Sequence, residues 1–108
     1  MTINEYQQAA MRTAPQNART WSNVVLGLAG ESGEAADIVK KYLHQGHPLD
    51  HERLLKELGD IAWYLALGAE VLGVDLESIL QANVDKLMTR YPEGFDAERS
   101  MHRAEGDV

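Results

Sequence analysis

Four acidic residues stand out because they form two pairs with the same spacing. Glu31 and Glu34 are three residues apart, and so are Glu57 and Asp60. Residues three apart on a helix lie on nearly the same face, so each pair would project its two carboxylates together. Glu31 and Glu57 also each interrupt a stripe of apolar residues at helical spacing. The pattern therefore predicts four carboxylates directed toward a helical interior or a groove beside it.

Four carboxylates at the edge of an apolar core need a compensating positive charge. Burial of unpaired like charges is costly and raises carboxyl pKa values. Mg²⁺ supplies that compensation, because it accepts carboxylate oxygens and keeps positions open for water and phosphate groups; Mn²⁺ is a substitute. The alternative is a solvated face on which the acids pair with Lys40, Lys41, Lys56 or Arg53. The matched spacing of the two pairs favours the metal site.

A second polar pattern lies nearer the C-terminus. Asn83, Lys86 and Arg90 are spaced by three and four residues, and Tyr91 follows them. One interpretation is a solvated helix face on which Lys86 and Arg90 complement the negative end of the helix dipole. The other is a set of donors for phosphate groups opposite the acids. Four aromatic residues could stack on a flat ligand, although their helical spacing favours a place in the core: Trp21, Tyr42, Trp63 and Tyr64.

The elements that carry these residues are expected to be helices. Apolar residues recur every three or four positions in four segments, and no segment alternates with the period of a strand. Thr2 and Glu5 have the spacing of a capping box, and Asp50 is a good helix cap. The predicted helices are residues 3–13, a segment from Ser22 or Asn23 to His44, 51–72 and 76–91. We predict an all-α fold, an antiparallel bundle of about four helices, with residues 93–108 as a polar tail.

Length and charge limit the classes of protein that fit. A chain of 108 residues has room for one domain, so residues 1–108 are expected to form a single unit. The 17 acidic and 10 basic residues give a net charge of −7, which argues against binding to nucleic acid or an anionic membrane. A small phosphorylated ligand held through a metal is still allowed. The absence of cysteine excludes thiolate zinc sites, disulfide scaffolds and a cysteine nucleophile.

Two further expectations concern location and assembly. No apolar run is long enough to span a bilayer and no secretory leader is visible, so we expect a cytoplasmic protein. Apolar positions occur on more than one side of the helices at residues 22–44 and 51–72. Because so small a monomer buries limited area, we expect a homodimer or homotetramer.

Taken together, three runs of sequence resemble the MazG-type all-α nucleoside triphosphate pyrophosphohydrolases. The shared pattern is Glu-x-x-Glu followed by Glu-x-x-Asp, with a flanking Gly-Asp and a later Lys-Leu-x-x-Arg-Tyr-Pro segment. The resemblance extends from about residue 6 to residue 99, and the runs that carry it are residues 27–37, 57–66 and 83–92. The family often has a further acid or apolar residue directly after the second glutamate. Ala35 stands there in this chain, with Asp37 as a candidate outer acid, which leaves the number of metal ions open.

The resemblance implies an activity and roles for the residues. Members convert a nucleoside triphosphate, most often a deoxy one, to the monophosphate and pyrophosphate, and so limit unwanted nucleotides. All four paired acids would be Mg²⁺ ligands, with Glu31 or Glu34 as the base that activates water. Asn83 and Lys86 would contact the nucleotide or its phosphates. The spacing of the polar stripe, apart from the resemblance, makes Arg90 and Tyr91 further candidates for neutralising the phosphates. Two alternatives stay open: a helical interaction module without turnover, and a hydrolase of a related metabolite such as phosphoribosyl-ATP.

Overall fold

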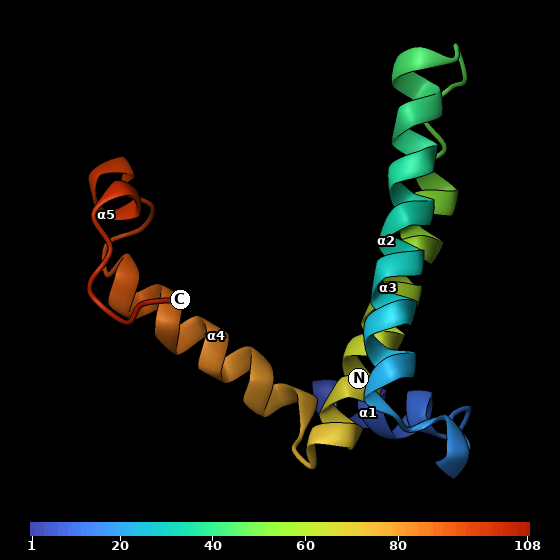
Figure 1. Cartoon of the computed structure of the whole chain (residues 1–108), viewed down its shortest axis with the longest axis horizontal. Helices are drawn as coiled ribbons and strands as arrows, with labels where there is room; N and C mark the ends of the chain where they lie inside the picture. The colour runs from blue at the N-terminus through green and yellow to red at the C-terminus, as the bar shows by residue number, and fades with distance from the viewer. The chain divides into compact units, whose positions relative to one another are not determined.

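The computed structural model describes residues 1–108, and the chain is all-α, as predicted and as expected of a MazG-like helical bundle (Figure 1). It forms two compact units, Met1–Leu76 and Glu77–Val108, and each is described by itself. No helix is both long enough and apolar enough to cross a membrane. The elements are α1 (Ile3–Met11), the 3₁₀ turn η1 (Gln16–Ala18), α2 (Trp21–His44), α3 (His51–Leu72), α4 (Leu76–Arg90) and α5 (Ala97–Met101).

The first unit is built on a hairpin of two long helices, with α1 packed against its second arm. Figure 1 shows α2 and α3 side by side, joined by the short turn at residues 45–50. Because the turn is short, the two helices run antiparallel over most of their length. Gly68 of α3 allows close approach to α2, because a Cβ added there would lie 3.3 Å from Val24 Cγ1. The buried apolar side chains are Met11, Ala14, Val24, Ile38, Ala66, Leu67, Ala69 and Leu76.

The helix ends follow from local chemistry, with small corrections to the predicted boundaries: α1 ends at Met11 and α4 at Arg90, each slightly earlier than predicted. The capping box of Thr2 and Glu5 is present, and the Asp50 carboxylate accepts a hydrogen bond from the Arg53 backbone N–H at 3.0 Å. α2 begins at Trp21, one or two residues earlier than predicted. The reason is that Thr20 caps this helix: its hydroxyl oxygen accepts from the Asn23 backbone N–H at 3.2 Å.

One buried amide ties α1 to the far end of the hairpin. Gln7 is 5% exposed, and its Nε2 donates to Glu70 Oε1 at 3.1 Å and to the Val74 carbonyl at 3.3 Å. Its Oε1 accepts from the Leu76 backbone N–H at 2.6 Å. A buried amide with all these partners satisfied holds three segments in one arrangement. The C-terminal end of α3 is thereby fixed relative to α1.

The second unit contains the rest of α4 and the segment predicted to be a polar tail. That segment carries a short helix, α5, which the sequence pattern did not predict because five residues are too few to show a period. Asp96 caps α5 by accepting from the backbone N–H groups of Glu98 and Arg99. Near the chain end, the Asp107 carboxylate accepts two hydrogen bonds from the Arg90 guanidinium, at 2.8 and 2.6 Å.

Candidate metal centre

The structure brings three of the four paired acids together between α2 and α3. Glu31 comes from α2, while Glu57 and Asp60 come from α3. Each offers one carboxylate oxygen, and these three oxygens lie within 4.8 Å of one another. Glu34 is exposed and is not one of the three, although its side chain is near enough to Glu57 to affect that residue's pKa. The result is a group of oxygen donors of the kind that a divalent cation accepts.

Glu57 lies at the centre of this group and is the most buried of its members. It is only 8% exposed, and its Oε2 atom has no hydrogen-bond partner. The pKa of the Glu57 carboxyl is raised above its usual range, first because of the adjacent Glu31 carboxyl and then because of burial. A buried carboxylate oxygen without a partner is costly. The donor set therefore fits a hard cation, which would satisfy that oxygen and offset the mutual repulsion.

The solvated-face alternative is met in part, because Glu34 and Asp60 are exposed, but only one of the four acids lies near a basic side chain. Lys40 and Lys41 both pair with Asp37, at 3.2 and 2.9 Å, and not with the glutamate pair of α2. Arg53 is the one cation near the cluster, and its Nη2 lies 3.9 Å from Glu57 Oε1. That distance is at the outer limit of an ion pair and beyond a hydrogen bond. Most of the negative charge in the cluster is therefore not neutralised by basic side chains.

A hollow of about 310 Å³ opens directly beside the carboxylates. Its lining consists of the two acids Glu31 and Asp60 and the two aromatic residues Trp63 and Tyr64. The two rings meet edge to face, with centroids 4.9 Å apart. Helical spacing favoured a core role for both aromatic residues, yet both are half-buried and have ring surface on the hollow. Aromatic side chains beside a metal-binding site can contact a flat or sugar-like part of a ligand.

Contacts that the sequence pattern did not indicate hold these two rings in place. The Trp63 indole N–H donates to the Thr13 hydroxyl oxygen at 2.8 Å and to the Ala10 carbonyl at 3.2 Å. Tyr64 lies against Gly27 of α2, where an added Cβ would overlap its ring. Gly27, Gly30 and Gly33 are spaced by three along α2, but this spacing alone does not identify the ring that approaches Gly27.

The remaining candidate residues belong to the second unit. Asn83 and Lys86 are exposed on α4. Arg90, at the end of α4, is paired with Asp107, and this carboxylate raises the pKa of the guanidinium. Tyr91 packs its ring against Phe95, with centroids 5.4 Å apart. Within this unit, Asn83 and Lys86 are thus the members of the polar stripe whose side chains face solvent.

Comparison with known proteins assigns the chain to a family. Residues 19–95 match the MazG nucleotide pyrophosphohydrolase domain. The chain is also 36% identical over 105 residues to the Gene 37 protein of Mycobacterium phage L5, an alignment that covers 87% of this chain and 92% of the relative. No solved structure gives a significant match. The matched residues include both acidic pairs, the hollow between α2 and α3 and the polar stripe of α4, and the chain belongs to the MazG nucleotide pyrophosphohydrolase family.

Proposed function

We propose that the protein hydrolyses nucleoside triphosphates, deoxynucleotides above all, to the monophosphate and pyrophosphate in a reaction that depends on Mg²⁺. The observation that carries the proposal is the cluster of carboxylates from Glu31, Glu57 and Asp60. One buried oxygen of this cluster has no hydrogen-bond partner, and the hollow beside it is lined by two aromatic residues. Residues 1–108 would act as one cytoplasmic domain that removes unwanted nucleotides. Membership of the family supports the reaction class.

The carboxylates would hold the metal and prepare the attacking water. Glu31, Glu57 and Asp60 supply oxygen ligands, with Glu34 within reach as a fourth. When bound, Mg²⁺, or Mn²⁺ in its place, neutralises charge on the phosphate oxygens. The base that takes the proton from water would be Glu31 or Glu34. Glu34 suits this role because it lies outside the group of three oxygens.

Further residues would recognise the rest of the substrate. The hollow beside Trp63 and Tyr64 would receive the nucleoside, since aromatic rings stack on bases and sugars. On α4, Asn83 and Lys86 would contact the nucleotide. Arg90 and Tyr91 would take part as well, although the Arg90 guanidinium already binds the Asp107 carboxylate through two N–H groups. Arg90 would therefore contribute to phosphate binding mainly after that pair opens.

We also propose that the working form is a homodimer or homotetramer. Large apolar side chains on the hairpin face solvent, and contiguous exposed apolar surface commonly marks an interface. The most exposed ones on the two long helices are Val25, Leu26 and Leu43 of α2 and Leu55, Leu58 and Leu72 of α3. Light scattering on the purified protein tests this point, and a monomer at micromolar concentration would refute it.

The decisive experiment measures pyrophosphate release from a panel of ribo- and deoxynucleoside triphosphates and phosphoribosyl-ATP, together with thermal unfolding at increasing Mg²⁺. We expect Glu57→Gln to lower the rate by about 100-fold or more and to abolish stabilisation by Mg²⁺, because a ligand at the buried centre is lost. Glu52→Gln, on the exposed first turn of α3, is the matched control and should behave as wild type.

Three results would count against the proposal. Release of no pyrophosphate from any compound, with no stabilisation by Mg²⁺ or nucleotide, would favour a helical interaction module. Turnover of phosphoribosyl-ATP alone would identify a related hydrolase with a different base pocket. An unchanged rate of pyrophosphate release in Glu57→Gln would show that the cluster of three carboxylates is not the active site.

A further inference from the structure

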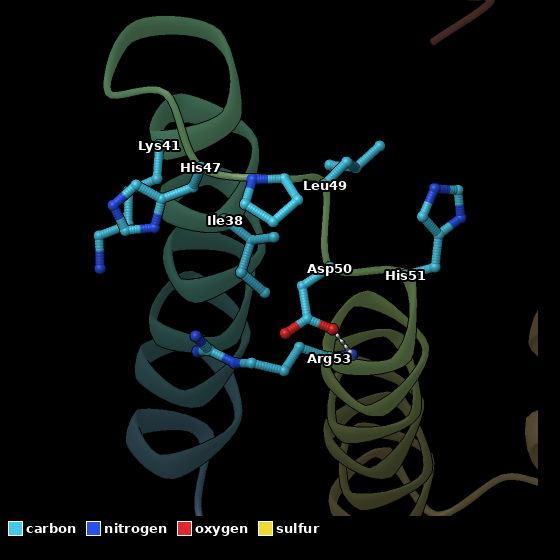
Figure 2. A pocket seen from close by; sticks show the side chains of 8 residues that line it. Ile38, Lys41, His47, Leu49, Asp50, His51 and Arg53 are labelled. Carbon is cyan, nitrogen blue, oxygen red and sulfur yellow. Dashed lines mark hydrogen bonds between the residues drawn. The ribbon is translucent and has the colours of Figure 1, made fainter.

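A second hollow, of about 450 Å³, lies at the turn that connects α2 and α3. Figure 2 shows that its side chains come from both helices and from the turn between them. This hollow is separate from the one lined by Trp63 and Tyr64, and shares no lining residue with it. The lining residues are Ile38, Lys41, His47, Pro48, Leu49, Asp50, His51 and Arg53.

The charge of this hollow is opposite in sign to that of the whole chain. Lys41 and Arg53 carry fixed positive charges, whereas Asp50 is the one acidic residue in the lining. The Asp50 carboxylate is engaged as the cap of α3, where it accepts from the Arg53 backbone N–H. His47 adds an imidazole on the side of Lys41 (Figure 2). A locally positive hollow in a protein of net charge −7 suits an anion.

The two cations have donors left for a ligand. Figure 2 shows the Arg53 side chain reaching from α3 toward α2. No hydrogen bond engages its guanidinium, and its contact with Glu57 Oε1 is long, at 3.9 Å. Lys41 Nζ lies 2.9 Å from Asp37, which leaves two of the three ammonium N–H donors. A guanidinium in this state can bind a phosphate through two parallel N–H groups.

Arg53 also lies close to the cluster of carboxylates from Glu31, Glu57 and Asp60. It is four residues before Glu57 on α3, which is about 6 Å along the helix axis. The same guanidinium therefore borders the hollow at the turn and the edge of the candidate metal centre. An anion held by Arg53 would lie next to the oxygens that bind the cation. That arrangement matches a phosphate chain of which one end is held by metal and the other by basic side chains.

We propose that the hollow at the α2–α3 turn binds the pyrophosphate group, with Arg53 as a two-donor ligand and Lys41 as the second cation. The group is either free inorganic pyrophosphate or the two terminal phosphates of a nucleoside triphosphate, and we assign the hollow to the latter as the place where the leaving group is held. The assignment to substrate rests on the proposed function, whereas binding of pyrophosphate itself does not.

The first test is calorimetric titration of inorganic pyrophosphate into the full chain with a chelator present, so that the carboxylate group holds no metal. We expect wild-type protein to bind, Arg53→Gln to weaken binding by about tenfold or more, and Lys41→Gln to weaken it less. Lys56→Gln is the matched control, because it removes one exposed charge from the same helix without lining the hollow, and should change affinity less than about twofold.

Amide chemical shifts recorded in the same titration locate the ligand. Perturbation centred on residues 47–53 supports the proposal. Absence of binding, equal weakening by Arg53→Gln and Lys56→Gln, or perturbation confined to other segments overturns it. Lys41→Gln carries the test if Arg53→Gln does not fold.

The second test distinguishes the two sources of the pyrophosphate group. With Mg²⁺ and a nucleotide substrate, added pyrophosphate should inhibit, and Arg53→Gln should both raise KM by about tenfold and weaken this inhibition. Inhibition of equal strength in wild type and Arg53→Gln would overturn the assignment to the leaving group. A chain that binds pyrophosphate at residues 47–53 but hydrolyses no nucleotide would refute only the proposed function. An active enzyme in which Arg53→Gln leaves the affinity for pyrophosphate unchanged would refute only this inference.

Discussion

The contact between Gly27 and Tyr64 can be tested by adding a single methyl group to α2. In Gly27→Ala the new Cβ would overlap the Tyr64 ring, so the ring or the helix has to move. Gly30, three residues later on the same helix, provides the matched control, since a Cβ there would meet no atom within 4 Å. Both glycines lie inside α2, so alanine brings the same gain in helix propensity at either position.

The expected magnitudes follow from two opposing effects. Alanine is favoured over glycine inside a helix by about 1 kcal/mol. Overfilling a packed contact costs about 1–3 kcal/mol. Gly30→Ala should therefore stabilise the protein by about 0.5–1 kcal/mol. Gly27→Ala should range from neutral to destabilising by about 2 kcal/mol, so that the difference between the two variants, about 1–3 kcal/mol, isolates the contact with the ring.

Urea unfolding followed by far-UV circular dichroism measures both free energies of unfolding. Adding Tyr64→Leu to Gly27→Ala removes the ring and should recover most of the deficit, which a double-mutant cycle would show as a coupling energy. In the nucleotide assay, Gly27→Ala should raise KM because Tyr64 lines the hollow beside the carboxylates. If Gly27→Ala stabilises the protein as much as Gly30→Ala does, the packing of Tyr64 on α2 described above is wrong.

Three other perturbations have expected outcomes. Gln7→Leu should lower the free energy of unfolding by about 1–3 kcal/mol in urea titrations, because three hydrogen bonds are lost and the buried Leu76 N–H is left without its acceptor; an unchanged value would contradict the role of Gln7 in joining α1 to α3. Thr13→Val should cost about 1 kcal/mol by the same measurement, through loss of the bond to the Trp63 indole, while Thr13→Ser should not. Arg90 holds the pKa of Asp107 below its usual range, so the pair stabilises the protein at neutral pH and less as acid protonates the carboxylate. Thermal unfolding of Asp107→Asn should accordingly differ from wild type at pH 7 and converge with it in acid; a gap that persists in acid would contradict this.

The helices and the acidic pairs could be predicted because both follow from spacing along one segment. An apolar stripe with a three-and-four period identifies a helix, and an acid within the stripe identifies a side chain directed at the interior. Glu57 illustrates this, since it interrupts the α3 stripe and is 8% exposed. The start of α2 was misplaced because Thr20, Ser22 and Asn23 are all good caps, and only the backbone geometry shows which one is used.

Features that join distant residues could not be predicted. The bond from Trp63 to Thr13 spans 50 positions, and the pair of Arg90 with Asp107 spans 17. Nothing in the local pattern around either residue indicates its partner, because the partner depends on how helices pack and where side chains point. Glu34 is a similar case: its spacing is the same as that of the other acids, yet it is exposed and is not one of the three acids whose oxygens lie within 4.8 Å of one another.

The indole of Trp63 lies between the end of α1 and the hollow beside the carboxylates, which gives the protein an optical signal for occupancy. The chain has two tryptophans, and the other, Trp21, is 52% exposed at the start of α2. Emission from Trp21 reports bulk water, whereas emission from Trp63 reports the hollow. Replacing Trp21 by phenylalanine would leave Trp63 as the single tryptophan, so that nucleotide binding could be followed in real time by tryptophan emission without a label.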